Sequence, residues 1–114
     1  MSDLFPKRGE IWSVNFNPGR GSEQKGIRPA LIVQNDTGNQ YAATTIVAAI
    51  TTTIKIYPVT VLLEAKGAGL SKESMVNCAQ LLTVDKSRLR KRLGKLDEKL
   101  MERVDKALCV SLAL

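Results

Sequence analysis

Histidine is absent from the 114-residue sequence. Because histidine is the usual general base near neutral pH and the commonest metal ligand, its absence excludes Ser-His-Asp and Cys-His catalysis and histidine-bound zinc. The two cysteines, Cys78 and Cys109, lie too far apart in sequence to form a CxxC pair, and the carboxylates do not cluster as a magnesium site requires. The sequence therefore predicts no metal and no cofactor. Any catalysis must use Arg, Lys, Thr, Ser, Tyr or an isolated carboxylate.

Other residue classes are scarce as well. No apolar run approaches the roughly 18 to 20 residues of a membrane span, and the N-terminal segment has no apolar core of a leader peptide, so we expect a cytoplasmic protein that does not enter membranes. A chain of this length does not depend on disulfides, and we interpret both cysteines as reduced and buried. With one Trp, two Tyr and two Phe, long platforms for stacking bases are not expected.

Positive charge is in excess: 17 Lys and Arg stand against 11 Asp and Glu, a formal net charge of +6. Such a balance raises the local concentration of polyanions and favours nucleic acid or an acidic protein as partner. Six of the basic residues lie close together in sequence: Lys86, Arg88, Arg90, Lys91, Arg92 and Lys95. The alternative is that this cluster is only the solvated face of a helix.

One alternating segment and several apolar, β-branched runs predict a mainly β chain. Strands are expected at residues 10–16, 30–33, 44–51, 59–63 and 74–84, the second buried on both faces and the last long enough to contain a bulge. Residues 35–39 are predicted as a turn and residues 66–70 as a loop. Strands joined by short turns cannot form a parallel sheet. The sequence therefore predicts one domain over residues 1–114, a small antiparallel barrel or half-barrel.

The C-terminal segment changes period. Leu100, Val104 and Leu108 recur at helical spacing, and Asp97 is placed to cap a helix of about four turns. A shorter helical turn over residues 86–92 is also expected, because Asp85 can cap it and Gly94 can end it. We expect the long helix to pack on the barrel or on a partner.

Polar residues gather between the first two predicted strands, at residues 21–29 (GSEQKGIRP). This loop ends in Arg28 followed by Pro29, and a residue before proline is confined to extended geometry, so the arginine leaves the loop at a fixed point. Its guanidinium can bind a phosphate through two hydrogen bonds. The alternative is a solubilising loop in which Arg28 has no role. Thr51, at the end of a predicted apolar strand, is by itself ordinary β surface.

Several segments resemble the MazF/PemK family of toxins. They are KRGEIW at residues 7–12, GSEQKGIRPALIVQND at 21–36, IVAAIT at 46–51, DKSRL at 85–89 and VSLAL at 110–114, so the likeness covers nearly the whole chain. The pattern G-x-E-Q-x-G-x-R-P-x-L is specific at that length. The resemblance implies an SH3-like antiparallel barrel with a C-terminal helix, a fold shared with the gyrase poison CcdB.

The resemblance also implies an activity: metal-independent cleavage of single-stranded RNA by attack of the 2′-hydroxyl, leaving a 2′,3′-cyclic phosphate and a 5′-hydroxyl. It places Arg28 and Thr51 at the catalytic positions, with Glu23 as a base or as an anchor for Arg28. The residues expected to bind RNA are Ser22, Gln24, Arg20 and Lys25. Residues 79–82 (AQLL) depart from related toxins, which carry charged residues there, so the recognised RNA sequence is not carried over.

Two kinds of partner follow from the same resemblance. A small acidic antitoxin is expected to cover the RNA groove, and a homodimer is expected because the C-terminal helix is apolar on more than one side. The alternative function is a poison without enzymatic activity on the same barrel, in the manner of CcdB. The Arg28 loop together with Thr51 favours the enzyme.

Overall fold

The computed structural model describes residues 5–18 and 25–114. These residues form the strands β1 (Glu10–Asn15), β2 (Ile27–Ile32), β3 (Thr44–Thr51), β4 (Thr60–Leu63), β5 (Ser74–Asp85) and β6 (Leu89–Lys95). The helices are α1 (Asp36–Tyr41), α2 (Ala65–Ala68) and α3 (Glu98–Leu112), with a 3-10 turn, η2 (Lys86–Arg88), between β5 and β6. Strands at residues 10–16, 44–51, 59–63 and 74–84 were predicted, and each is confirmed to within one residue at either end.

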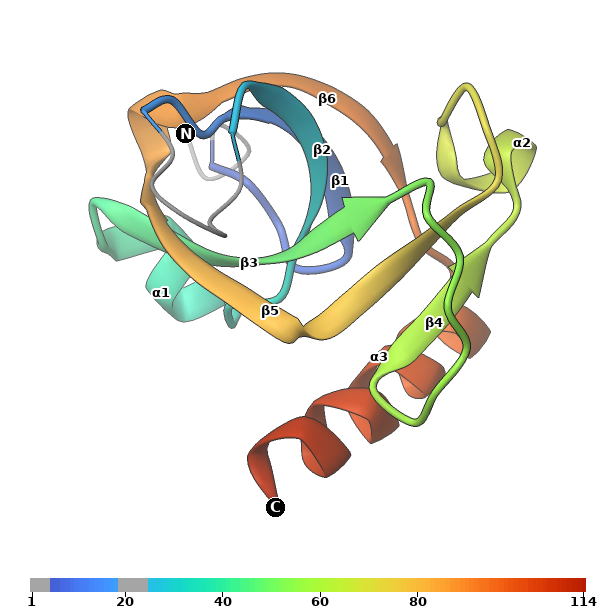
Figure 1. The fold of residues 1–114 in the computed structure, drawn as a ribbon. Coiled ribbons are helices and arrows are strands. Elements are labelled where there is room, and N and C mark those ends of the chain that lie inside the picture. The colour runs from blue at the N-terminus through green and yellow to red at the C-terminus, as the bar shows by residue number, and fades with distance from the viewer. Residues whose placement is uncertain (1–4, 19–24) are drawn as a thin grey trace.

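All the strands belong to one antiparallel sheet in the order β4-β5-β3-β2-β1-β6. The sheet curls strongly, so that β6, β1 and β2 arch over one end of β3 and β5 (Figure 1). The mainly β fold with a C-terminal helix is therefore confirmed. The curled sheet is not closed, because β4 and β6 remain its two edges.

The curled sheet buries a core on each of its faces. The first core takes side chains from strands β1 to β5 and from α2 and α3, which cover that face. The second core lies inside the curl and takes side chains from β1, β2, β3 and β5. Strand alternation divides β2 between them, since Leu31 belongs to the first core and Ala30 and Ile32 to the second. The prediction of a strand buried on both faces is thus confirmed for residues 30–32.

A bulge lets β5 serve both cores. Its register with β3 shifts where Ala48 faces Leu81 and the adjacent Ala49 faces Asn77, so three residues of β5 have no partner in the ladder. Extra residues on one strand of a pair bend that strand and increase its twist. The bend is plain in Figure 1. Val76 then packs in the first core and Val84 in the second, and the predicted bulge is confirmed.

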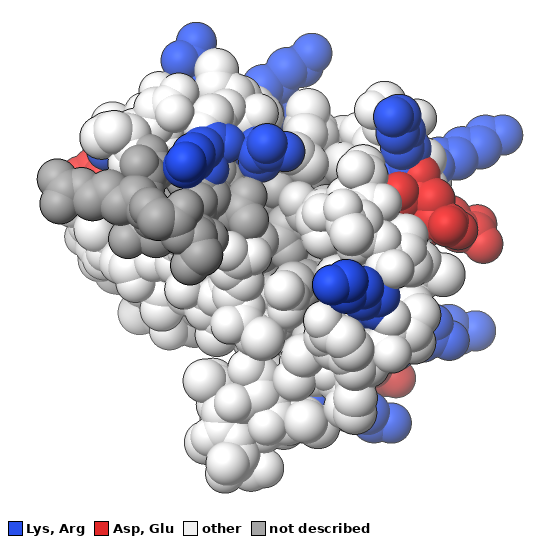
Figure 2. Space-filling model, viewed as in Figure 1, with Lys and Arg blue, Asp and Glu red and all other residues white. Residues whose placement is uncertain are grey.

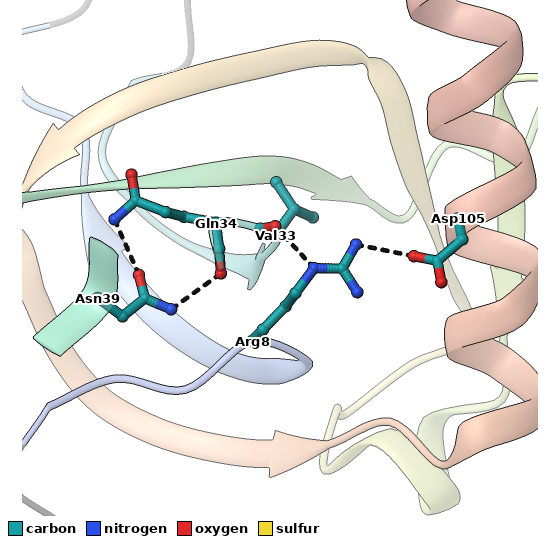
Figure 3. A network of polar contacts seen from close by, with 5 residues as sticks. All are labelled: Arg8, Val33, Gln34, Asn39 and Asp105. Atoms are coloured by element: carbon teal, nitrogen blue, oxygen red, sulfur yellow. Dashed lines mark hydrogen bonds and ion pairs between the residues drawn. The ribbon is translucent and has the colours of Figure 1, made fainter. Parts of the chain in front are cut away.

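Two short helices replace the irregular segments that the sequence predicted. Residues 35–39 begin α1 rather than a turn, because the Asn35 side chain accepts the Gly38 N–H at 2.8 Å and caps a helix. The buried Asn39 then exchanges hydrogen bonds with Gln34 (Figure 3). It also accepts one from the Thr45 hydroxyl at 2.7 Å. The predicted loop at residues 66–70 likewise overlaps α2 (Ala65–Ala68), whose C-cap is Gly69 in the left-handed conformation.

The predicted helix over residues 86–92 is wrong beyond its first turn. Asp85 does cap η2, accepting the Ser87 N–H at 2.8 Å. The chain then continues as β6, because its backbone pairs with β1 along the edge of the sheet. Gly94 does not end a helix but lies within β6, with its Cα against the backbone of α2. Four residues of the basic cluster, Arg90, Lys91, Arg92 and Lys95, therefore lie on an edge strand, and Lys86 and Arg88 lie on η2.

The C-terminal helix α3 forms as predicted, with the Asp97 side chain accepting the Leu100 N–H at 2.9 Å. Val104 and Ala107 enter the first core. Arg8 fastens the helix to the sheet by donating to the carbonyl of Val33 at 2.8 Å and pairing with Asp105 at 2.7 Å (Figure 3). Among the described residues no helix is long and apolar enough to cross a membrane.

The two cysteines have different environments. Cys78 is fully buried in the first core, as predicted, and burial raises its pKa to about 11. Cys109 is exposed on α3, so the prediction that it is buried is wrong. The reason is helical geometry, since Val104 and Ala107 face the sheet and Cys109 is on another side of the helix.

We expect Gly94→Ala to destabilise the protein by about 1–3 kcal/mol, as overpacking does. A Cβ at this position would meet the carbonyl oxygen of Ala68 at 2.4 Å, and that oxygen belongs to the backbone and cannot move alone. Gly67→Ala in α2 is the matched control, because its Cβ would have no neighbour within 4 Å. Urea unfolding followed by circular dichroism measures both. Equal stability of the two variants would show that α2 and β6 are not in close contact.

We expect the Cys109→Ser variant to resist Ellman's reagent at pH 8 until it is denatured. Its remaining thiol, Cys78, is buried and has a pKa raised to about 11, so little thiolate forms at that pH and the reagent cannot approach it. The absorbance of the released thiolate, recorded before and after addition of guanidinium chloride, measures the effect. Rapid reaction in the native state would contradict the packing of the first core.

Candidate active site

Arg28 is the second residue of β2. The sequence predicted it at the end of the preceding loop, and that prediction is wrong because β2 already begins at Ile27. It faces Val14 across the β1–β2 ladder, and Pro29 faces Ser13. Only the second half of β2 also pairs with β3, starting at Ala30. Proline has no N–H to donate and is tolerated where a strand lacks a neighbour on one side. The first half of β2 is such a stretch, so it holds Arg28 in regular strand geometry beside an open position.

The register between β2 and β3 brings Arg28 and Thr51 to the same end of the sheet. The last pair of that ladder is Ala30 with Ala49, and two further residues in the same register lead to Arg28 and Thr51. Alternation along each strand places both on the face of Ala30 and Val47, which belong to the second core. The two residues thus lie at the rim of the concave face, where β2 and β3 are no longer paired.

Each of the two side chains is already positioned by a local hydrogen bond. The Nε of Arg28 donates to the carbonyl of Lys25 at 2.9 Å, and within the described part of the chain neither of its Nη groups has a partner. The hydroxyl of Thr51 accepts the N–H of Thr53 at 3.1 Å, which leaves its O–H available as a donor. Arg28 is exposed and Thr51 half-buried. The rim therefore offers a guanidinium fork and a hydroxyl to an anion.

Both ends of the loop before Arg28 are tied together. The side chain of Asn17 accepts the Gly26 N–H at 2.9 Å, and the Phe16 N–H donates to the Gly26 carbonyl at 2.9 Å. Gly26 has a φ of 74°, a conformation that favours glycine. Lys25 is exposed, as its expected contact with RNA requires. The other predicted site residues of this loop, Arg20, Ser22, Glu23 and Gln24, lie outside the described residues.

The segment after Thr51 was not singled out by its sequence. Residues 52–58 are all exposed, and they include three large apolar side chains, Ile54, Ile56 and Tyr57. The Thr60 hydroxyl braces the segment, because its single O–H lies within hydrogen-bond distance of the carbonyls of both Lys55 and Tyr57. Apolar residues in an otherwise polar run are the only signal of this surface in the sequence. The loop that follows Thr51 thus exposes one aromatic ring and two aliphatic side chains.

The basic cluster does not act as a unit. Arg92 pairs with the buried Glu10 at 3.0 Å, and Glu10 also accepts the indole N–H of Trp12. Arg88 donates to backbone carbonyls of residues 15 and 17. Of the others, Arg90, Lys91 and Lys95 are exposed. On the face drawn in Figure 2 the Lys and Arg side chains do not form one continuous patch. The described residues contain no group of three or more metal-ligating His, Cys, Asp or Glu.

Comparison with known proteins gives consistent matches over almost the whole chain. The model of the PemK-like, MazF-like toxins of type II toxin-antitoxin systems matches residues 7–112. Endoribonuclease EndoA of Bacillus subtilis (strain 168) is 44% identical over 113 residues, which are 97% of each protein.

Solved structures agree. An endoribonuclease bound to its cognate antitoxin, from a mycobacterial species, superposes with a TM-score of 0.83 at 27% identity over 96% of each chain. MazF of Deinococcus radiodurans gives 0.83 at 26% identity over 98% of this chain and all of the other.

Proposed function

The chain belongs to the family of PemK-like, MazF-like toxins of type II toxin-antitoxin systems, and from that premise we propose that it is an endoribonuclease with Arg28 and Thr51 as its catalytic residues. One observation carries the assignment of the site. The β2–β3 ladder ends at Ala30 with Ala49, and alternation beyond that pair, which directs Arg28 and Thr51 to one face, supports the assignment. A protein that only binds a partner has no need of that pair.

The proposed reaction uses the RNA's own nucleophile. The 2′-oxygen attacks the adjacent phosphorus and loses its proton, and the bond to the 5′-oxygen breaks as that oxygen takes up a proton. The products are a 2′,3′-cyclic phosphate and a 5′-hydroxyl. Such a step depends on in-line placement and on stabilisation of the charge that develops on the phosphorane, and it requires neither a metal nor a histidine.

Arg28 supplies the stabilising charge in this proposal. Arginine is a poor base, because a guanidinium keeps its proton in proteins, but its planar fork matches two phosphate oxygens. Thr51 orients a non-bridging oxygen through its hydroxyl. Glu23 remains the proposed base or anchor for Arg28. Its position outside the described residues leaves that role to the family resemblance.

RNA recognition is proposed to use single-stranded, splayed bases, whose edges are accessible to side chains. The exposed ring of Tyr57 and the aliphatic Ile54 and Ile56 lie in the loop after Thr51 and offer apolar contacts to bases. Lys25 is proposed to bind a phosphate, and Arg20, Ser22 and Gln24 are proposed to contact RNA from the loop that precedes it. In this proposal, basic side chains bind the phosphates of the RNA, and apolar and uncharged polar side chains contact its bases.

The proposed partners are an acidic antitoxin and a second copy of this chain in the cytoplasm. An endoribonuclease of similar structure has been solved with its cognate antitoxin. The net charge of +6 favours an acidic partner here. At the end of α3, Val110, Leu112 and Leu114 are exposed, and an isologous dimer contact would cover such residues.

We expect the purified chain to cleave a long RNA in the presence of excess EDTA, because the reaction proposed needs no metal ion. Electrophoresis of the products, with chemical tests for cyclic phosphate and 5′-hydroxyl ends, measures it. Arg28→Ala is the control for contaminating nucleases. An RNA left intact under all ionic conditions would favour the alternative, a poison without enzymatic activity.

We expect Arg28→Lys to lose most activity while long-range affinity for RNA changes little, since the charge stays and the two-point geometry is lost. Loss of one such transition-state contact costs about 10² to 10³ in rate. Arg28→Ala should be at least as slow, and Thr51→Ala milder. Single-turnover cleavage measures the rates, and melting curves should shift little because Arg28 is exposed. Near-normal cleavage by Arg28→Lys would leave charge attraction as its only role.

A further inference from the structure

The Arg88 side chain donates hydrogen bonds to backbone carbonyls at the end of β1. Its Nη1 donates to the carbonyl of Asn15 at 3.0 Å and to the carbonyl of Asn17, on either side of Phe16. The residue is half-buried, and 71 positions separate it from Asn17 in sequence. Hydrogen bonds from a charged donor are roughly twice as strong as neutral ones, so this contact fixes the point where the chain leaves β1.

Further hydrogen bonds lead from that point to Arg28. Asn17, held by Arg88, accepts the Gly26 N–H through its side chain at 2.9 Å. Lys25, the neighbour of Gly26, accepts the Arg28 Nε at 2.9 Å. A series of hydrogen bonds therefore connects Arg88 with Arg28 through Asn17 at one end of the β1–β2 loop and residues 25 and 26 at its other end. A displacement of Asn17 would move the carbonyl that orients the Arg28 guanidinium.

The turn that carries Arg88 is itself fixed. Asp85 accepts the Ser87 N–H at 2.8 Å, and the Lys86 N–H donates to the Ala43 carbonyl at 3.0 Å. The hydrogen bonds from Ser87, and to a smaller extent the charge of Arg88, lower the pKa of the Asp85 carboxyl. That carboxylate is therefore ionised at neutral pH and caps η2. The Arg88 side chain thus extends from an ordered turn toward the end of β1.

We propose that Arg88 is a positioning residue of the active site, which sets the orientation of Arg28 by clamping the base of the loop between β1 and β2. The inference rests on the proposed function, because it takes Arg28 as a catalytic residue. It assigns Arg88 no contact with RNA. Arg90, two residues further along β6, is exposed and has no partner among the described residues. It carries the same charge without the clamp.

The test compares Arg88→Met with Arg90→Met. Both changes remove one positive charge and keep a long apolar stem, but only the first removes the donors to Asn15 and Asn17. We expect single-turnover cleavage by Arg88→Met to fall by about 10- to 100-fold relative to Arg90→Met, as small misplacements of catalytic groups do. The RNA affinities of the two variants should be equal. Arg88→Lys should recover most of the rate, because its ammonium can still donate to both carbonyls.

A double variant identifies the route. If Arg88 acts only through Arg28, the combination Arg28→Ala with Arg88→Met should cleave no more slowly than Arg28→Ala alone. Asn17→Ala breaks the next contact in the series and should reproduce the loss of Arg88→Met, which keeps the test open if that variant folds poorly. Additive losses in the double variant would overturn the inference, as would equal rates for Arg88→Met and Arg90→Met.

The inference and the proposed function fail in different ways. An inactive Arg28→Ala together with a normal Arg88→Met would overturn the inference and support the proposed site. Normal cleavage by Arg28→Ala would overturn the proposed site and the inference with it. Melting curves of every variant accompany the rates, so that a loss caused by unfolding is recognised.

Discussion

The register between β2 and β3 is the constraint on which the candidate site depends. Their ladder ends at the pair of Ala30 with Ala49, so that toward its beginning β2 has only β1 as a neighbour among the described strands. Paired antiparallel residues share a face of the sheet, and alternation beyond that last pair therefore directs Arg28 and Thr51 to the same face. A slip of one residue would turn the side chains of the slipped strand to the opposite face, and in β2 it would exchange Leu31 with Ala30 and Ile32 between the two cores. Packing of the second core thus protects the geometry of the site.

Stability and chemistry occupy different parts of the same strands. The buried halves of β2 and β3 contribute to both cores, and the bulge in β5 allows one long strand to cover them both. The ends of β2 and β3 reach the rim, where Arg28 is exposed and Thr51 half-buried. Side chains there can be chosen for their chemistry because little apolar area depends on them. This arrangement is common where functional groups stand at the ends of a rigid scaffold.

Arginine serves repeatedly as a donor to backbone carbonyls where strands end. Arg8 donates to the carbonyl of Val33 just after β2, Arg28 to that of Lys25 just before it, and Arg88 to those of residues 15 and 17 at the end of β1. A guanidinium carries five N–H donors in a plane, so it can satisfy a carbonyl and still present donors elsewhere. The positive charge of the chain is therefore only partly a surface property. Part of it fixes the loop that bears the site.

Local patterns in the sequence determined the elements that are marked by apolar, β-branched runs or by a helical period. The strands at residues 44–51 and 74–84 follow from such runs and the helix capped by Asp97 from the period, and the types of residue at the site follow from a family motif. Tertiary structure alone decided the rest. A basic run that suits a helix became β6 because the edge of β1 offered its backbone hydrogen bonds. Arg28 and Thr51 reach the same end of the sheet because strands far apart in sequence pair in one register, and pairing energy depends on neighbours that no local window of sequence contains.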